Sequence, residues 1–264
     1  MNYNLLKGKK GIITGALNES SIAWKAAEHA FAEGAELVLT NTPVSIRLGT
    51  IAQLGEKCNS PVIPADATNM EDLENLVSQA MNHFGGKIDF VLHSVGTSPN
   101  VRKGIPYEGI NYDFMQKTLD ISALSFHKLM NVLYNKDAMN EGGSIVALTY
   151  IAAERAFEGY CDMADAKALL QSITRNFGLK FGKEKGVRVN TVSQSPTATT
   201  AGMGIAGMQR MLEYSGKLSP LGNATADDCA DFLVTLFSDL TRKITMQNLY
   251  NDGGFSTTGL VSGI

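Results

Sequence analysis

Short apolar segments alternate with longer amphipathic segments along almost the whole chain. Strand-like runs are predicted at residues 11–14, 36–40, 61–64, 89–93, 143–148, 187–192 and 244–250. Helical patterns fill most of the intervals, at residues 21–33, 45–57, 71–84, 112–139, 162–181 and 226–237. Parallel strands require such crossover helices, and right-handed crossovers place helices on both faces of the sheet. The pattern therefore predicts an α/β fold with a Rossmann-type, doubly wound parallel sheet, whose ligand site lies at the carboxyl ends of the strands.

One segment interrupts this alternation. Residues 197–216 lie between a strand and a helix and are rich in Thr, Ala, Gly and Met. The segment fits either a surface loop with a short amphipathic helix or a mobile helical lid, because it follows the carboxyl end of a strand. No repeat and no Pro/Gly-rich linker divides the rest of the chain. We therefore expect residues 1–264 to form a single domain with a lid insertion at about 197–216.

Charge and composition exclude several classes of function. The chain has 264 residues with 23 Lys and Arg against 26 Asp and Glu, a net charge of −3. This mild acidity argues against a nucleic-acid partner, and no apolar run approaches the roughly 18 residues of a membrane span. The four histidines show no metal-ligand spacing, so we expect no metal site. Three widely spaced cysteines favour a reducing compartment, and we expect a cytoplasmic protein without membrane partners.

The turn after the first strand is a candidate phosphate site. Gly15 ends the strand, and Ser20 and Ser21 precede a helical pattern. Backbone N–H groups at a helix N-terminus bind pyrophosphate, and either serine is placed to cap the helix and to donate its hydroxyl to a phosphate. The full G-x-G-x-x-G fingerprint is absent, so an ordinary capped turn remains an alternative at this point.

Other strand ends carry residues that suit a dinucleotide. Asp66 is placed to accept a hydrogen bond from an adenine amino group, although a helix-capping aspartate is an equal alternative. Ser94 and Gly96 end another strand and leave room for a flat ligand. Residues 41–42 are Asn-Thr where dinucleotide folds often place a ribose-binding carboxylate, and the nearest cation is Arg47. The sequence therefore leaves NADH and NADPH open.

Tyr160 and Lys167 are the strongest catalytic candidates. They are seven residues apart, so on a helix they share a face at a separation of about 10 Å. This spacing suits two groups that converge on one ligand, a phenol on a reacting carbonyl and an ammonium on a ribose. A nearby ammonium is expected to lower the pKa of Tyr160. Tyr150, at the end of a strand, is expected to point into the same space; each tyrosine alone would fit a core aromatic.

These residues resemble the short-chain dehydrogenase/reductase superfamily and, within it, the bacterial enoyl-acyl-carrier-protein reductases of type II fatty acid synthesis. The resemblance is carried by residues 13–15 with 21–23, 93–96, 120–122, 148–150 with 153–156, 186–190 and 252–255. Most of the superfamily has Tyr-x3-Lys and a serine about 13 residues before the tyrosine. Here the spacing is Tyr-x6-Lys and Ala147 stands at the serine position, which is typical of an enoyl reductase.

The resemblance implies a Rossmann-fold reductase that uses NADH, with NADPH as a second possibility, to transfer hydride to C3 of a trans-2-enoyl thioester. Tyr160 would stabilise the charge on the thioester oxygen, Lys167 would hold the nicotinamide ribose, and Tyr150 would contact the acyl group. The substrate would be linked to acyl carrier protein, and the enzyme would be a homotetramer. The cofactor contacts that the resemblance implies are Gly15, Ser21, Ile22, Asp66, Ala67, Ser94, Gly96, Lys167, Thr197 and Thr199.

The chain also departs from the family pattern. Residues 194–197 read Gln-Ser-Pro-Thr where related enzymes commonly have Ala-Gly-Pro-Ile. Of the basic lid residues that would meet an acidic carrier protein only Arg210 is present, so Arg102 and Lys103 are further candidates for that contact. Three lid methionines are expected to line an apolar acyl channel: Met203, Met208 and Met211. The alternatives are a carbonyl reductase or alcohol dehydrogenase of the same superfamily and a non-catalytic dinucleotide sensor.

Overall fold

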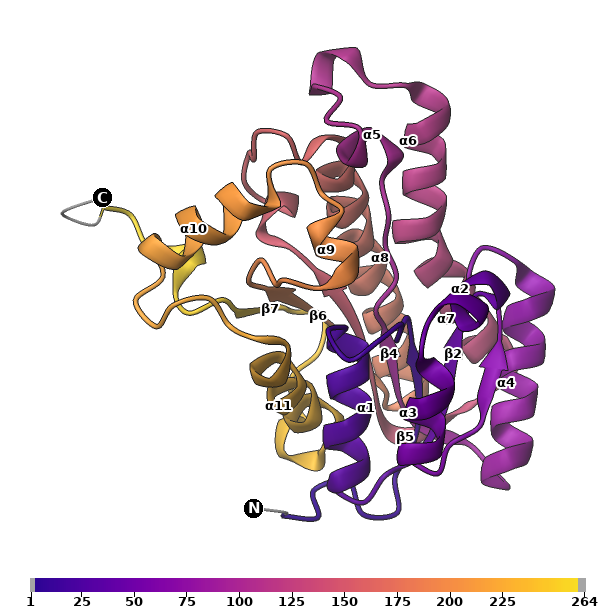
Figure 1. Ribbon diagram of the computed structural model, residues 1–264. Coiled ribbons are helices and arrows are strands. Elements are labelled where there is room, and N and C mark those ends of the chain that lie inside the picture. The colour runs from indigo at the N-terminus through magenta and orange to yellow at the C-terminus, as the bar shows by residue number, and fades with distance from the viewer. Residues whose placement is uncertain (1–2, 261–264) are drawn as a thin grey trace.

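A seven-stranded parallel sheet forms the centre of the protein, in a computed structural model that describes residues 3–260 (Figure 1). The strands are β1 (Lys10–Thr14), β2 (Glu36–Asn41), β3 (Val62–Pro64), β4 (Ile88–His93), β5 (Met139–Thr149), β6 (Arg188–Gln194) and β7 (Asn248–Asn251). Their order is β3-β2-β1-β4-β5-β6-β7, and every pair is parallel. The winding direction reverses between β1 and β4, and such a reversal opens a ligand crevice beyond the strand ends. The predicted doubly wound α/β fold is confirmed.

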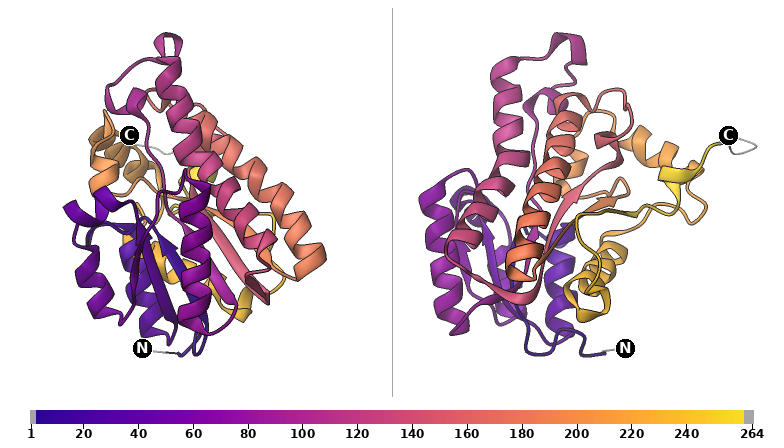
Figure 2. Two further views of the ribbon diagram at one scale, coloured as in Figure 1. Left: turned by 90° about the vertical axis from the view of Figure 1, so that its right-hand side faces the viewer. Right: turned by 180° about the vertical axis from the view of Figure 1, so that it is seen from behind.

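Helices cover both faces of the sheet (Figure 2). One face packs on α1 (Ile22–Ala32), α3 (Ile51–Lys57) and α11 (Ala226–Phe237), and the other on α4 (Met70–Phe84), α7 (Ser125–Asn135) and α8 (Cys161–Lys185). Side chains alternate along each strand, so Ile12 of β1 enters one core and Ile13 enters the other. The remaining helices are α2 (Pro43–Leu48), α5 (Pro99–Arg102), α6 (Tyr112–Leu119), α9 (Thr200–Met203) and α10 (Met208–Leu218).

The helix expected at residues 45–57 is wrong, because the chain forms two helices, α2 and α3, with a break at Gly49. A Cβ built on Gly49 would lie 2.7 Å from the Leu17 backbone oxygen and 2.8 Å from that of Ser45. The N–H of Thr50 donates to the same Leu17 oxygen at 3.0 Å. The helix is therefore interrupted here, because the backbone at Gly49 packs against the turn after β1.

The long helical region expected at residues 112–139 is confirmed from Tyr112 to Asn135, and its expected end lies four residues too late. The chain forms α6, a π-helical turn at Asp120–Leu124 and α7, which ends at Asn135. In the π-helical turn the Ser122 hydroxyl accepts from the Thr97 N–H and donates to the Thr97 carbonyl, both at 3.0 Å. Asp137 has a left-handed φ of 48°, which turns the chain into β5 from Met139.

Smaller differences affect two boundaries. Helix α8 continues to Lys185, beyond the expected end at residue 181, and Gly186 closes it with a left-handed φ of 65°. The last strand starts at Asn248 and not at residue 244, because Met246 has a φ of 62° and leaves the extended conformation. None of the helices between residues 3 and 260 combines the length and apolar character needed to cross a membrane.

Candidate active site

The turn between β1 and α1 lies directly against the end of β4. Gly15 has a φ of 86°, and a Cβ at this position would lie 2.0 Å from the Ser94 carbonyl oxygen, so only glycine fits. The Ser21 hydroxyl accepts hydrogen bonds from the N–H groups of Leu17 and Asn18, both at 3.2 Å. Ser21 therefore shapes the turn and makes no side-chain cap on α1, which corrects the capping expectation.

A cavity of about 150 Å³, here called the turn cavity, lies beyond this turn. Its walls include Gly15, Asn41, Asp66, Ala67 and Val95. None of the described residues that line it is a lysine or an arginine. The cavity therefore brings together three of the residues expected to contact a dinucleotide, at the carboxyl ends of four strands.

Asp66 closes a local turn instead of capping a helix. Its Oδ1 accepts hydrogen bonds from the Thr68 N–H at 2.8 Å and from the Thr68 hydroxyl at 2.7 Å. The N-cap of α4 is Asn69, whose side chain accepts from two N–H groups of the first helical turn. The helix-capping interpretation of Asp66 is therefore wrong, and its role toward an adenine stays a prediction.

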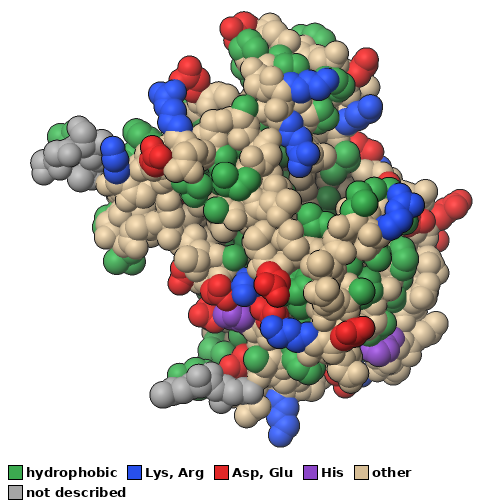
Figure 3. Space-filling view, viewed as in Figure 1, with side chains coloured by type: hydrophobic (Ala, Val, Ile, Leu, Met, Phe, Trp, Pro, Cys, Tyr) green, Lys and Arg blue, Asp and Glu red, His purple; other side chains and the backbone are tan. Residues whose placement is uncertain are grey.

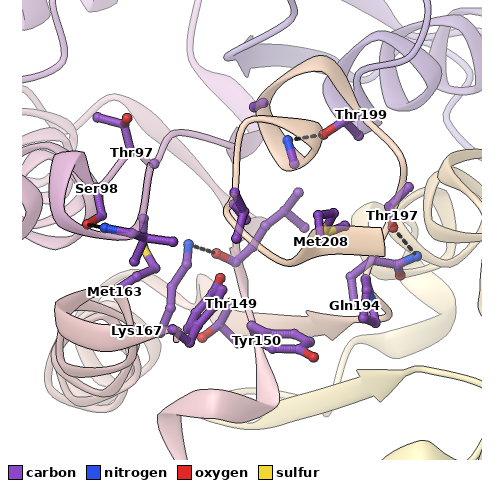
Figure 4. A pocket seen from close by; sticks show the side chains of 18 of the residues that line it. Thr97, Ser98, Thr149, Tyr150, Met163, Lys167, Gln194, Thr197, Thr199 and Met208 are labelled. Atoms are coloured by element: carbon purple, nitrogen blue, oxygen red, sulfur yellow. Dashed lines mark hydrogen bonds between the residues drawn. The ribbon is translucent and has the colours of Figure 1, made fainter. Parts of the chain in front are cut away.

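A second cavity of about 210 Å³, here called the tyrosine cavity, adjoins the first (Figure 4). Val95 lines both, so the two cavities follow one another along the edge of the sheet. Ser21 lines neither cavity. The tyrosine cavity brings together eight of the expected site residues: Ile22, Ser94, Gly96, Tyr150, Tyr160, Lys167, Thr197 and Thr199.

Lys167 enters the tyrosine cavity from α8. Its side chain is buried, and its Nζ donates to the Leu148 carbonyl oxygen at 2.8 Å. A Cβ built on Gly96 would lie 3.6 Å from this Nζ, so the ammonium faces a backbone that carries no side chain. Burial lowers the pKa of Lys167 to about 8, because the charged form loses its hydration.

Tyr160 immediately precedes α8 and lines the same cavity. The residue is 7% exposed, and its hydroxyl makes no hydrogen bond with residues 3–260. Burial raises the pKa of Tyr160, because a phenolate would lose its hydration. The expected lowering of this pKa by the ammonium is therefore wrong.

Tyr150 follows β5 and forms part of the cavity wall (Figure 4). Its ring lies 5.1 Å from the Tyr160 ring and 5.2 Å from the Phe157 ring, between centroids. Its hydroxyl is fully buried without a hydrogen-bond partner, and burial raises the pKa of Tyr150. Tyr150 therefore contributes its ring to the site, and its hydroxyl is enclosed by protein.

Residues 197–218 cover the tyrosine cavity from the side opposite α8. Met208 and Met211 line the cavity as expected, whereas Met203 does not and is 51% exposed. The expectation for Met203 is wrong because the short helix α9 turns this side chain toward solvent. The cavity is therefore apolar on the α10 side and polar near Lys167.

Hydrogen bonds join α9 to the turn after β1. The Thr200 hydroxyl accepts from the Asn18 side-chain amide at 2.8 Å, and the Thr200 N–H donates to the Ser20 hydroxyl at 3.1 Å. The two hydroxyls are 3.2 Å apart. These three contacts, here called the Thr200 latch, connect the covering segment to the candidate phosphate turn.

His93 is neutral and structural. It is buried at the end of β4, and its Nε2 lies 2.9 Å from the Ser125 hydroxyl. Burial first, and Lys167 second, lower the pKa of His93 to about 3. Across residues 3–260 no group of three or more His, Cys, Asp or Glu side chains is arranged to hold a metal ion.

Comparison with known proteins identifies the family. The family model described as Enoyl-(Acyl carrier protein) reductase matches residues 15–256. The chain belongs to this family. It is 34% identical over 259 residues to the Enoyl-[acyl-carrier-protein] reductase [NADH] 2 of Rhizobium meliloti (strain 1021), covering 97% of this chain and 94% of the relative. The expected enoyl reductase assignment is confirmed, and the alternative functions are not favoured.

Solved structures of enoyl reductases share the fold. The chain is 67% identical to FabI of Alistipes finegoldii in a FabI–NADH complex, with a TM-score of 0.96 over 98% of this chain and 91% of that one. It is 31% identical to the enoyl-[acyl-carrier-protein] reductase (NADH) of Aquifex aeolicus VF5, with a TM-score of 0.89 over 97% of this chain and 100% of that one.

In the segment after Gly96 the sequence of this enoyl reductase suggested Arg102 and Lys103 as contacts for a carrier protein, but it did not indicate Ser98, which lines the tyrosine cavity. Ser98, at the end of the loop after β4, and Asn100 of α5 donate to the carboxylate of Asp162 at 2.6 and 2.8 Å, and all three side chains are buried. Asp162 lies in the first turn of α8, two residues after Tyr160. The signal available in the sequence was the position of the loop, beyond the carboxyl end of a strand.

Proposed function

We propose that the protein reduces the C2–C3 double bond of a trans-2-enoyl thioester linked to acyl carrier protein, with NADH as the reductant, in fatty acid elongation. The observation that carries this proposal is the meeting of Tyr160 and Lys167 in one buried cavity that adjoins the turn cavity. The names of the related enzymes support the same substrate and the same cofactor.

A dinucleotide would extend from one cavity into the other, because Val95 lines both and Gly96 presents a backbone without a side chain beside Lys167. The adenosine would occupy the turn cavity beside Asp66 and Ala67, and the nicotinamide would lie near Lys167 and Thr197. NADH fits better than NADPH, because the described walls of the turn cavity offer no cation to a ribose phosphate. When bound, the reduced nicotinamide supplies the hydride that adds to C3 of the enoyl group.

The residues of the chain then act on the charge that develops on the thioester oxygen, until a proton from solvent adds to C2 and completes the saturated thioester. Tyr160 donates a hydrogen bond to this oxygen, and the raised pKa of Tyr160 keeps the phenol protonated. Lys167 holds the ribose hydroxyls and so fixes the distance between cofactor and substrate. The Tyr150 ring packs against Tyr160 and contacts the acyl group.

The proposal includes three further properties. Residues 197–218 act as a lid, because the Thr200 latch joins them to the turn after β1. The cytoplasm is the proposed location, since the three cysteines are buried and free, as is typical of a reducing compartment. The homotetramer rests on the resemblance to the family, and light scattering of the purified protein tests it.

The decisive assay follows oxidation of the reduced nicotinamide by its near-ultraviolet absorbance. Purified protein is mixed with a 2-enoyl thioester or with a ketone, each with NADH and with NADPH. We expect NADH oxidation with the enoyl thioester alone. Turnover of the ketone alone would assign the protein to the carbonyl reductases, and tight cofactor binding without any turnover would favour a sensor.

A further inference from the structure

Arg102 is a cation at the edge of the tyrosine cavity that has no anionic partner. It is the last residue of α5, its side chain is exposed, and it lines the cavity. Within residues 3–260 it takes part in no ion pair and no side-chain hydrogen bond. Lys167, the other cation that lines the cavity, is buried and donates a hydrogen bond to the Leu148 carbonyl oxygen.

The guanidinium marks the opening of the cavity to solvent. Three of the residues that line the cavity are exposed: Arg102 on α5, Ala201 on α9 and Gly96, which lies beside Lys167. A Cβ built on Gly204 would lie 3.4 Å from both Cζ and Nη2 of Arg102, so the guanidinium reaches across from α5 to the end of α9. In Figure 3 basic side chains gather on the upper part of the face, over α5 and α6.

In the proposed reaction the thioester extends to solvent on the Arg102 side of the cavity, because the nicotinamide would occupy the side of Lys167 and Gly96. Its carbonyl is at Tyr160, and its acyl chain fits the apolar wall that Met208 and Met211 provide. The remaining substituent, the arm attached to the sulfur, therefore extends toward solvent past Arg102. A guanidinium offers two parallel donors to a phosphate, which a lysine ammonium does not.

We propose that Arg102 binds the phosphate of the pantetheine arm on the thioester substrate. This inference rests on the proposed function, because it takes the enoyl group to lie at Tyr160. It gives the protein a substrate-binding residue outside the Tyr160–Lys167 pair, one that recognises the arm and not the acyl chain.

Lys103 provides a matched control. It is the next residue, carries the same charge and is exposed. Its Nζ lies 4.3 Å from the centroid of the Phe114 ring, and Lys103 does not line the cavity. The two variants Arg102→Gln and Lys103→Gln therefore remove one charge each from the same rim, and only the first removes it from the opening.

The test measures kcat and KM with NADH for three thioesters of one enoyl acid: the pantetheine thioester, the phosphopantetheine thioester and the carrier-protein thioester. The first two differ only by the phosphate. For Arg102→Gln we expect KM to rise about tenfold for the two phosphate-bearing substrates, with kcat retained, as loss of one charge-assisted contact implies. KM for the pantetheine thioester stays unchanged, Lys103→Gln leaves KM unchanged for the pantetheine and phosphopantetheine thioesters, and Arg102→Lys recovers part of the loss.

Three outcomes would overturn the inference. An equal rise in KM for all three substrates would make Arg102 a structural part of the opening. A rise for the carrier-protein thioester alone would place the contact on the surface of the carrier protein. Unchanged KM values would leave Arg102 without a role in substrate binding. Failure of the wild-type protein to reduce any of the three thioesters would instead refute the proposed function itself.

Discussion

Replacing Tyr160 by phenylalanine removes the one group that the proposed reaction needs on the thioester oxygen. The residue is 7% exposed and its ring packs 5.1 Å from the Tyr150 ring, and the variant preserves this packing. Because the hydroxyl makes no hydrogen bond with the described residues, its loss leaves no other donor or acceptor unsatisfied. The change therefore tests the chemistry and not the fold.

The size of the effect follows from where the hydroxyl lies. It donates to an oxygen that becomes negative only as the hydride is transferred, inside a cavity where burial already raises the pKa of the phenol. Loss of one donor to such an oxyanion costs about 3–4 kcal/mol, a fall of about 10²–10³ in kcat. We expect the affinity for NADH to change little, because Lys167 and the turn cavity carry that binding.

Tyr150→Phe is the matched control in the same cavity. Its hydroxyl is buried without a partner, so the variant removes an unsatisfied polar atom. We expect Tyr150→Phe to keep kcat within about fivefold of the wild-type value and to unfold at the same or a higher temperature, since an unsatisfied buried polar group costs about 1–3 kcal/mol. Stopped-flow absorbance of NADH and thermal unfolding measure both variants.

Two results would refute the assignment of Tyr160. Turnover of Tyr160→Phe within tenfold of wild type would show that the hydroxyl does not stabilise the transition state. A wild-type kcat that falls with a pKa near neutrality, and no longer does so in Tyr160→Phe, would show that the phenol ionises there, contrary to the effect of burial.

Three further changes test other parts of the molecule. Lys167→Ala should raise the Kd for NADH by about tenfold or more, since it removes a charged hydrogen-bond donor, and an unchanged Kd in a fluorescence titration would reject the ribose role. Thr200→Val removes the two contacts that the Thr200 hydroxyl makes with Asn18 and Ser20 and keeps the backbone N–H bond to Ser20. It should speed NADH release by about fivefold, as loss of one net hydrogen bond implies, whereas an unchanged stopped-flow release rate would mean that these hydroxyl contacts do not retain the cofactor. Asp137 pairs with Lys87 and Lys185, which lower its pKa from 3.8 to about 2, so its stabilising effect is present above pH 3.8 and is lost as the pH falls toward 2. Asp137→Asn should therefore lower Tm at neutral pH by an amount that shrinks in acid, and a difference in Tm that does not depend on pH would contradict this.

The order of strands and helices can be predicted from the sequence, because the spacing of apolar residues differs between strands and helices. Apolar runs separated by amphipathic stretches identify a doubly wound sheet regardless of loop detail. The break at Gly49 is not readable in this way, because its cause is a contact with Leu17, thirty-two residues away in the chain. The same holds for the π-helical turn around Ser122, which is organised by Thr97 on another loop.

In the candidate site too, local patterns were predictable from the sequence and contacts between distant residues were not. Tyr160 and Lys167 are found by their spacing, because they are seven positions apart, one just before α8 and the other within it. The Thr200 latch joins residues that are 180 or more positions apart, so no local pattern indicates it. The direction of the Tyr160 pKa shift was predicted wrongly because spacing reports the nearby ammonium, whereas burial depends on the complete fold.

Burial acts on the two central groups of the site in a way that suits the proposed chemistry. It raises the pKa of Tyr160 and lowers that of Lys167 to about 8, so each group is shifted toward its neutral form. At neutral pH Lys167 still carries its charge, Tyr160 remains a phenol, and His93, with a pKa of about 3, adds no charge. Before the reaction the site therefore holds one buried positive charge, on Lys167, and one hydrogen-bond donor, Tyr160, and both stabilise an anionic transition state. A phenolate beside the ammonium would cancel that charge and remove the donor. The burial of Tyr160, which keeps the phenol protonated, therefore serves the proposed reaction.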